Sequence, residues 1–170
     1  MTIQEICLTL KDKFPIKSYD MRKKTATKKT DSTATKIFDK YGSMIEDSIA
    51  IVKNSKKGID PNIFFDLVVL ADVKKESLAD DVLGISLKTI LRYAQEGKPL
   101  LPRYAESALK VIALYKKGVE IFGDKDQFNR WLQKPAFGLD GQVPYTLLGM
   151  TTGIDLVLEE LIRIEFGALA

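Results

Sequence analysis

Residues 119–170 of the chain read VEIFGDKDQFNRWLQKPAFGLDGQVPYTLLGMTTGIDLVLEELIRIEFGALA. The segment QFNRWL at residues 127–132 predicts a short aromatic turn, and the glycines and prolines after it predict an irregular loop. Apolar residues then recur every three or four positions, which predicts a last helix capped by Thr151 or Thr152. The stripe consists of Ile154, Val157, Leu158, Leu161 and Ile164. This stretch therefore predicts a small helical domain over residues 119–170.

The residues upstream also follow a helical pattern. Apolar side chains over residues 37–52 predict one helix that ends near Gly58. Asp60 and Pro61 predict the start of a second helix. The body of this helix, residues 63–70, is apolar on nearly every side, so we expect it to be buried in this core or against a second copy of the chain. A continuous apolar run of this kind could also be a buried strand, but the sequence has no second strand-like run to pair with it. The predicted fold class is therefore all-α.

Within the helical region of residues 36–118, residues 78–97 favour a helix-turn-helix. Gly84 permits the left-handed backbone of a sharp turn, and Ser86 can cap the next helix. We expect four residues to pack this helix inward, namely Ile85, Ile90, Leu91 and Ala94. The predicted DNA-binding residues are Ser86, Lys88, Thr89, Arg92, Tyr93 and Lys98, since Arg reads guanine edges while Lys, Thr and Tyr hold phosphates. A helical hairpin without DNA contacts is the alternative. Residues 99–118 predict a longer helix that follows.

The two ends of the chain carry opposite charge. The first thirty residues hold eight basic side chains and three acidic ones, whereas residues 119–170 hold four basic and eight acidic ones. This asymmetry predicts different partners for the two ends. We interpret residues 1–35, rich in Lys and Thr, as a flexible basic arm, which is either a solvated tail or a source of extra phosphate contacts.

Several classes of protein are disfavoured by what the sequence lacks. The chain has no histidine, no glycine-rich phosphate loop and no nucleophile elbow. We therefore predict no enzymatic activity, no catalytic residues, no cofactor and no metal site. No apolar run reaches the roughly 18 residues that a membrane span needs, and no secretory signal is recognisable. Together with the single cysteine, Cys7, these features predict a cytoplasmic protein without a membrane partner.

A series of motifs near the C-terminus resembles a known family. The order F-G-D, F-x-x-W-L, P-x-x-x-L-x-G-x-x-P, L-L, G-x-x-x-V and L-x-R-I-E-x-G is similar to the Xre/MbcA/ParS toxin-binding domain. The carriers are Phe122, Gly123, Asp124, Phe128, Trp131, Leu132, Pro135, Leu139, Gly141, Pro144, Leu147, Leu148, Gly153, Val157, Leu161, Arg163, Ile164, Glu165 and Gly167. The chain departs from the family at Gly149 and Met150, where members usually have an acidic residue and a threonine.

The resemblance implies an antitoxin of the Xre type. Such antitoxins neutralise a RES-domain toxin that destroys NAD by covering its active site, and they repress their own operon through a helix-turn-helix. Carried over to this sequence, the implied toxin-binding residues are Arg163, Gly167, Ala168, Leu169 and Ala170. Operator DNA is the second implied partner, and we expect a homodimer because repressors of this plan meet two half-sites. The alternative is a free-standing helix-turn-helix transcription regulator that uses its C-terminal domain for oligomerisation.

Overall fold

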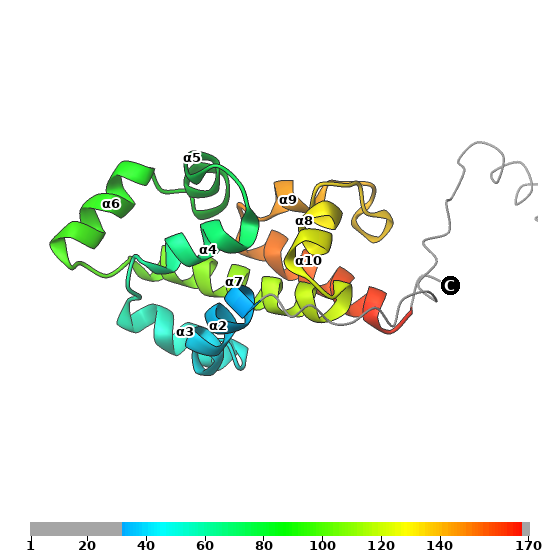
Figure 1. Cartoon of the computed structure of the whole chain (residues 1–170), viewed down its shortest axis with the longest axis horizontal. Helices are drawn as coiled ribbons and strands as arrows, with labels where there is room; N and C mark the ends of the chain where they lie inside the picture. The colour runs from blue at the N-terminus through cyan, green and yellow to red at the C-terminus, as the bar shows by residue number, and fades with distance from the viewer. Residues whose placement is uncertain (1–31, 168–170) are drawn as a thin grey trace, which may run out of the picture.

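The computed structural model describes residues 32–167, and over that range it confirms the all-α prediction (Figure 1). Most of the predicted arm lies outside the described residues, as do Ala168, Leu169 and Ala170. Residues 32–35, predicted as the end of the arm, form the first turn of α2. The elements in chain order are α2 (Ser32–Tyr41), η1 (Gly42–Met44), α3 (Ser48–Lys57), α4 (Ile63–Ala71), α5 (Lys75–Ser77), η2 (Leu78–Leu83), α6 (Leu87–Glu96), α7 (Pro102–Phe122), α8 (Lys125–Leu132), η3 (Phe137–Leu139), α9 (Pro144–Leu147) and α10 (Thr151–Glu165).

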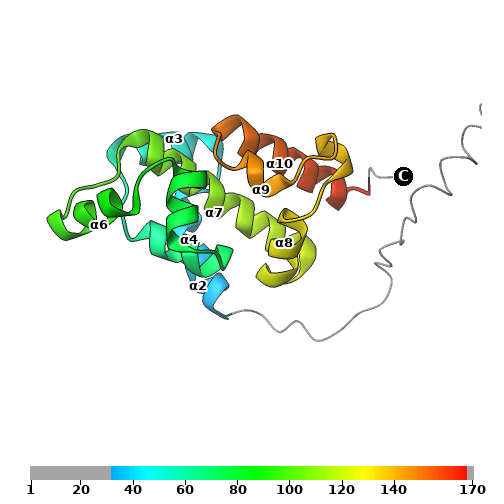
Figure 2. The same ribbon diagram turned by 90° about the horizontal axis from the view of Figure 1, so that it is seen from above.

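Helix α7 is the central element, and it packs against α2, α3, α4, α8 and α10 (Figure 2). Pro102 occupies its first turn, where the missing N–H has no helical partner to lose. The helix predicted over residues 99–118 is present, but it begins at Pro102, continues to Phe122 and ends at Gly123, whose φ is 94°. Because α7 runs across the boundary predicted after residue 118, the two predicted regions share one scaffold.

The single helix predicted over residues 37–52 is wrong, because the chain forms two helices there. After Tyr41 it makes the 3-10 turn η1, and Asp47 then starts α3 by accepting a hydrogen bond from the Ala50 N–H at 2.6 Å. Apolar residues before and after this break differ in burial. Ile37 and Tyr41 are buried, whereas Ile49 is 64% exposed. The predicted end at Gly58 is confirmed, with a φ of 82°.

Helix α4 begins at Ile63, two residues after the predicted first helical residue, Pro61, because Asp60 forms a turn before it. The Asp60 carboxylate accepts the Asn62 N–H at 2.8 Å, and the Ile63 N–H bonds to the Asp60 carbonyl. Four α4 side chains are fully enclosed by this chain alone, namely Ile63, Phe64, Leu67 and Leu70. Its apolar character therefore does not require a second copy, and the homodimer stays a prediction that rests on other grounds.

Candidate functional site

The segment between α4 and α6 has the local geometry that the sequence predicts for a turn between helices. Helix α5 runs into the π-helical turn η2, which ends at Gly84 in the left-handed conformation, with φ 62° and ψ 33°. The Ser86 Oγ then caps α6 by accepting the Thr89 N–H at 3.3 Å. Both local predictions, the left-handed glycine and the serine cap, are confirmed.

Helix α6 is attached to the core by one narrow stripe. Ile85 and Ile90 are buried as predicted, and Ala94 is half-buried. Leu91 was predicted to pack inward and is instead 41% exposed. The reason is angular: Leu91 follows Ile90 by about 100° around the helix axis and so lies beyond the stripe that meets the core.

The outer face of α6 carries the cations of the predicted DNA-binding set. Lys88, Thr89 and Arg92 line a shallow hollow together with Leu91 and Gln95. Lys88 and Arg92 are exposed and have no ion pair with any described residue. This face can therefore offer two unpaired cations to an anionic backbone.

The other predicted DNA-binding residues are engaged within the chain. Ser86 is used as the cap, and its Oγ also lies 2.9 Å from the Thr89 hydroxyl. Tyr93 packs against the core and lies under the Arg92 guanidinium, 5.7 Å from its ring centre. Lys98 forms an ion pair with Glu96 at 2.7 Å. These residues therefore hold α6 and the Arg92 side chain in place, and they add little to the exposed outer face of the helix.

The C-terminal region touches η2 directly. A Cβ at Gly149 would lie 2.5 Å from the carbonyl oxygen of Asp81, so only glycine fits the present distance between the two backbones. The Tyr145 hydroxyl is buried, and no described residue gives it a hydrogen bond. Burial raises the pKa of Tyr145, and the negative charge of Asp81 raises it further.

An aromatic cluster holds α8 against the end of α7. Phe122, Phe128 and Trp131 contact one another, with ring centres 5.5 Å apart for Phe122 and Trp131 and 5.9 Å apart for Phe128 and Trp131. The Asp124 carboxylate caps α8 by accepting the Gln127 N–H at 2.7 Å. Burial raises the pKa of Asp124, but the hydrogen bonds from Gln127 outweigh it, so the pKa is lowered overall. These motif residues build the fold.

Helix α10 confirms the predicted stripe, with Ile154, Val157 and Leu161 buried. The predicted cap is wrong, because Thr151 already lies inside the first turn and Met150 occupies the N-cap position without a side-chain hydrogen bond. The backbone of Met150 is extended, as an N-cap requires. Its side chain, however, has no oxygen that could accept a hydrogen bond from the first turn of α10.

Arg163, predicted from the resemblance to contact a toxin, has two partners inside the chain. Its Nε donates to the Glu160 carboxylate at 2.8 Å, and one terminal N–H donates to the Gly138 carbonyl at 3.1 Å. Gly167, the first residue of the predicted tail, is exposed and left-handed, with a φ of 68°.

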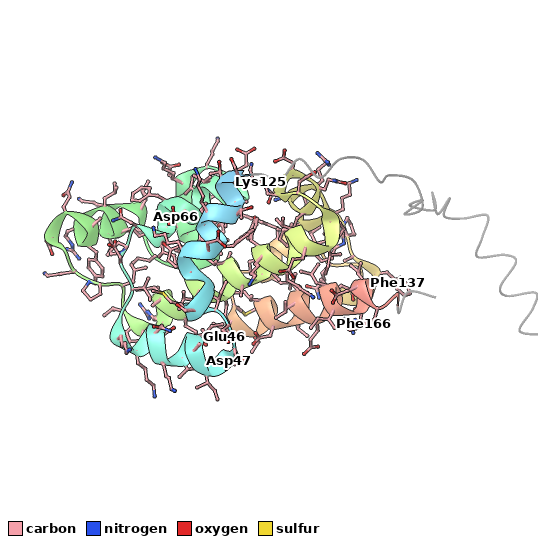
Figure 3. The ribbon with its side chains drawn as sticks, turned by 60° about the horizontal axis from the view of Figure 1, so that its bottom comes forward. Glu46, Asp47, Asp66, Lys125, Phe137 and Phe166 are labelled. Atoms are coloured by element: carbon pink, nitrogen blue, oxygen red, sulfur yellow. The ribbon has the colours of Figure 1, made fainter. Side chains whose placement is uncertain are left out.

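Two exposed aromatics beside Arg163 were missed by the sequence analysis. Phe137 and Phe166 lie at the same end of the molecule as the end of α10 (Figure 3). Periodicity could not find them, because Phe137 lies in an irregular loop and Phe166 follows the last helical turn. The sequence offered one signal for Phe137: a large apolar residue next to Gly138, within a loop of turn-forming residues, often lacks a place in the core.

Within residues 32–167 the structure offers no cluster of three or more side chains that could hold a metal ion. No helix in the same range is long and apolar enough to cross a membrane.

The end of α7 and the elements from α8 to α10 coincide with a family match. Residues 117–167 match the family model described as the antitoxin Xre/MbcA/ParS C-terminal toxin-binding domain. No curated protein matches the chain. The residues that build the aromatic cluster, the loop and α10 are thus similar to a domain by which antitoxins bind toxins, and this region supports an antitoxin of the Xre type.

Proposed function

We propose that the chain is an antitoxin that binds a RES-domain, NAD-degrading toxin, covers the toxin's active site and represses its own operon. The match of residues 117–167 to an antitoxin toxin-binding domain carries the proposal. The RES type and the operon are implied by the resemblance of the motifs. Co-expression with the neighbouring reading frame tests it: we expect a stable complex and preserved cellular NAD, whereas NAD loss despite co-expression would contradict it.

The segment after α10 supports active-site covering. Residues 167–170 are apolar or small and follow Phe166, the residue after α10, so a partner's cleft could receive them. Deleting residues 167–170 should abolish protection against the toxin and leave the melting temperature of the chain unchanged. Full protection by the shortened chain would rule out the role of the tail.

The exposed cations of α6 support operator binding. Helix α6 lies at one end of the molecule and the end of α10 at the other, so one chain has room for DNA and toxin together (Figures 1 and 2). Lys88→Ala and Arg92→Ala should weaken operator binding. Each variant that removes a phosphate contact should also reduce the slope of log K against log salt concentration by about one. Lys134→Ala, an exposed cation of the C-terminal region, is the control. Unchanged binding by both α6 variants would remove the assignment.

A further inference from the structure

Phe137 and Phe166 are the two most exposed large apolar side chains among the described residues, at 91% and 79%. Leaving a phenylalanine in water forgoes roughly 1.5–3 kcal/mol of burial free energy, so two at one place point to a surface that a partner covers. Both lie within residues 117–167, the part of the chain similar to a toxin-binding domain. Ile162, also exposed, lies in the last turn of α10, four residues before Phe166.

The loop that carries Phe137 is fixed by buried neighbouring side chains and by hydrogen bonds between its own backbone groups. Ala136 and Leu139, on either side, are buried. The Ala136 N–H donates to the Gln142 carbonyl at 3.0 Å, and the Gly141 N–H donates to the Ala136 carbonyl at 3.0 Å. The phenyl ring therefore projects from a backbone that is already fixed, which lowers the entropy lost when a partner covers it.

Arg163 joins this loop to α10. Glu160 is only 2% exposed, and its carboxylate accepts from the Arg163 Nε, while the other arm of the guanidinium donates to the Gly138 carbonyl, next to Phe137. A Cβ at Gly138 would collide with the Glu160 carboxylate, so glycine permits this approach. A planar guanidinium suits a bridge of this kind, because its donors have fixed directions.

We propose that Phe137 and Phe166 form an aromatic docking pair for the toxin, and that Arg163 is a positioning residue that sets Phe137 and does not itself bind the toxin. This rests on the proposed function, and it adds a contact surface beside the chain end. Asp140 is exposed in the loop of Phe137 and Glu159 is exposed on α10, and residues 119–170 hold eight acidic against four basic side chains, so the matching toxin surface is an apolar cleft with a basic rim. The pair lies away from α6, which leaves the outer face of α6 clear for operator DNA (Figure 3).

The first experiment measures the Kd of the full chain for the RES-domain protein of the same operon, in catalytically inactive form, by calorimetry. Phe137→Ala and Phe166→Ala should each weaken binding by roughly 30-fold or more, as truncation of a central aromatic does. Ile49→Ala, an exposed apolar residue outside the matched region, should leave the Kd unchanged. Because both rings are exposed, the circular dichroism and melting temperature should stay those of the wild-type chain.

The outcomes separate the two proposals. Toxin binding by wild type with unchanged Kd for both phenylalanine variants would overturn the docking pair and leave the proposed function standing. No binding by the wild-type chain would overturn both. If the variants bind toxin normally but dissociate a dimer of the free chain in sedimentation, the pair belongs to a second copy and the docking proposal is wrong.

The role of Arg163 is tested by a double-mutant cycle with Phe137. Arg163→Ala should weaken toxin binding in the wild-type background and have little further effect once Phe137 is alanine, because the loop then carries nothing to position. Equal losses in both backgrounds would show that Arg163 contacts the toxin itself. Arg163→Lys supplies a second cycle if the alanine variant is poorly folded: lysine keeps a charge for Glu160 but cannot bridge to Gly138 through a rigid fork.

Discussion

Met150 shows how one residue can leave a helix start incomplete. It has the extended backbone of an N-cap but offers no oxygen to the free N–H groups of α10. The first turn of α10 is therefore held by packing, including the close approach of Gly153 to the Leu147 carbonyl.

Met150→Thr should raise the free energy of unfolding by about 0.5–2 kcal/mol, because the hydroxyl can accept an N–H from the first turn. Urea denaturation measures the change. Met150→Ala serves as the control, since it removes the same exposed side chain without adding an acceptor. An equal gain from both variants would mean that the exposed methionine, and not the missing cap, limits stability.

Gly118 allows α7 and α8 to approach closely. A Cβ on Gly118 would lie 2.5 Å from the Phe128 ring, which is fully buried and cannot move aside without disturbing Tyr115 and Trp131. The helix predicted over residues 99–118 ends at Gly118, whereas the structure continues it for four more residues, to Phe122.

Gly118→Ala should lower the free energy of unfolding by about 1–3 kcal/mol through overpacking. Helix propensity alone would act in the opposite sense, by about 1 kcal/mol. Thermal denaturation followed by Trp131 fluorescence gives the sign. Gly42→Ala is the matched control, because nothing lies within 4 Å of its Cβ position, and it should not destabilise the chain. Stabilisation by Gly118→Ala would refute the close approach.

At the scale of elements, α8 begins at a carboxylate whose ionisation matters. The Asp124 side chain accepts the Gln127 N–H at 2.7 Å and the Gln127 side-chain amide at 2.9 Å. These bonds favour the ionised form and lower the pKa of Asp124 in the folded chain below its usual 3.8, despite partial burial. The carboxylate therefore stabilises the folded state above pH 3.8, and this contribution is lost as the pH falls through the folded pKa.

Asp124→Ala should cost about 0.5–2 kcal/mol at neutral pH, and the difference from wild type should shrink as the pH falls below 4. Urea unfolding at a series of pH values measures it. Asp126→Ala removes an exposed carboxylate from the same helix, whose partner is Lys125 at 3.2 Å, and should change stability little. A cost for Asp124→Ala that is constant down to pH 2 would contradict the role of ionisation.

On the scale of the whole molecule, the segment before α6 is packed against the C-terminal region. Helix α7 contacts both η2 and α10, and Gly149 lies directly against the Asp81 carbonyl of η2. The region that resembles a toxin-binding domain therefore packs against the turn that precedes α6.

We expect the described region to unfold in one transition. Trp131, the single tryptophan, reports on the C-terminal region, and far-ultraviolet circular dichroism reports on all helices, so their denaturation midpoints should coincide. Gly149→Ala should shift both midpoints downward together, because the added methyl group separates the two backbones. Met150→Ala, at the next position, should leave them coincident and nearly unchanged. Separate transitions in the wild type would show independent domains.

The sequence by itself determined the helical class and the local signals. Period, glycines and caps are properties of neighbouring residues, so the left-handed Gly84, the Ser86 cap and the helix end at Gly58 could be predicted from composition and spacing. The toxin-binding motifs were likewise recognisable in order along the chain, and the family match covers the same stretch.

Only the tertiary structure decided which side chains are free. The tertiary structure divides the predicted helix of residues 37–52, exposes Leu91 and encloses four side chains of α4 within one chain. Burial depends on how the elements pack against α7 and not on their own period. The tertiary structure also gave Arg163 two partners 3 and 25 residues away and left Phe137 uncovered beside them. Spacing along the chain cannot reveal contacts between a loop and a helix, and those contacts define the candidate docking surface.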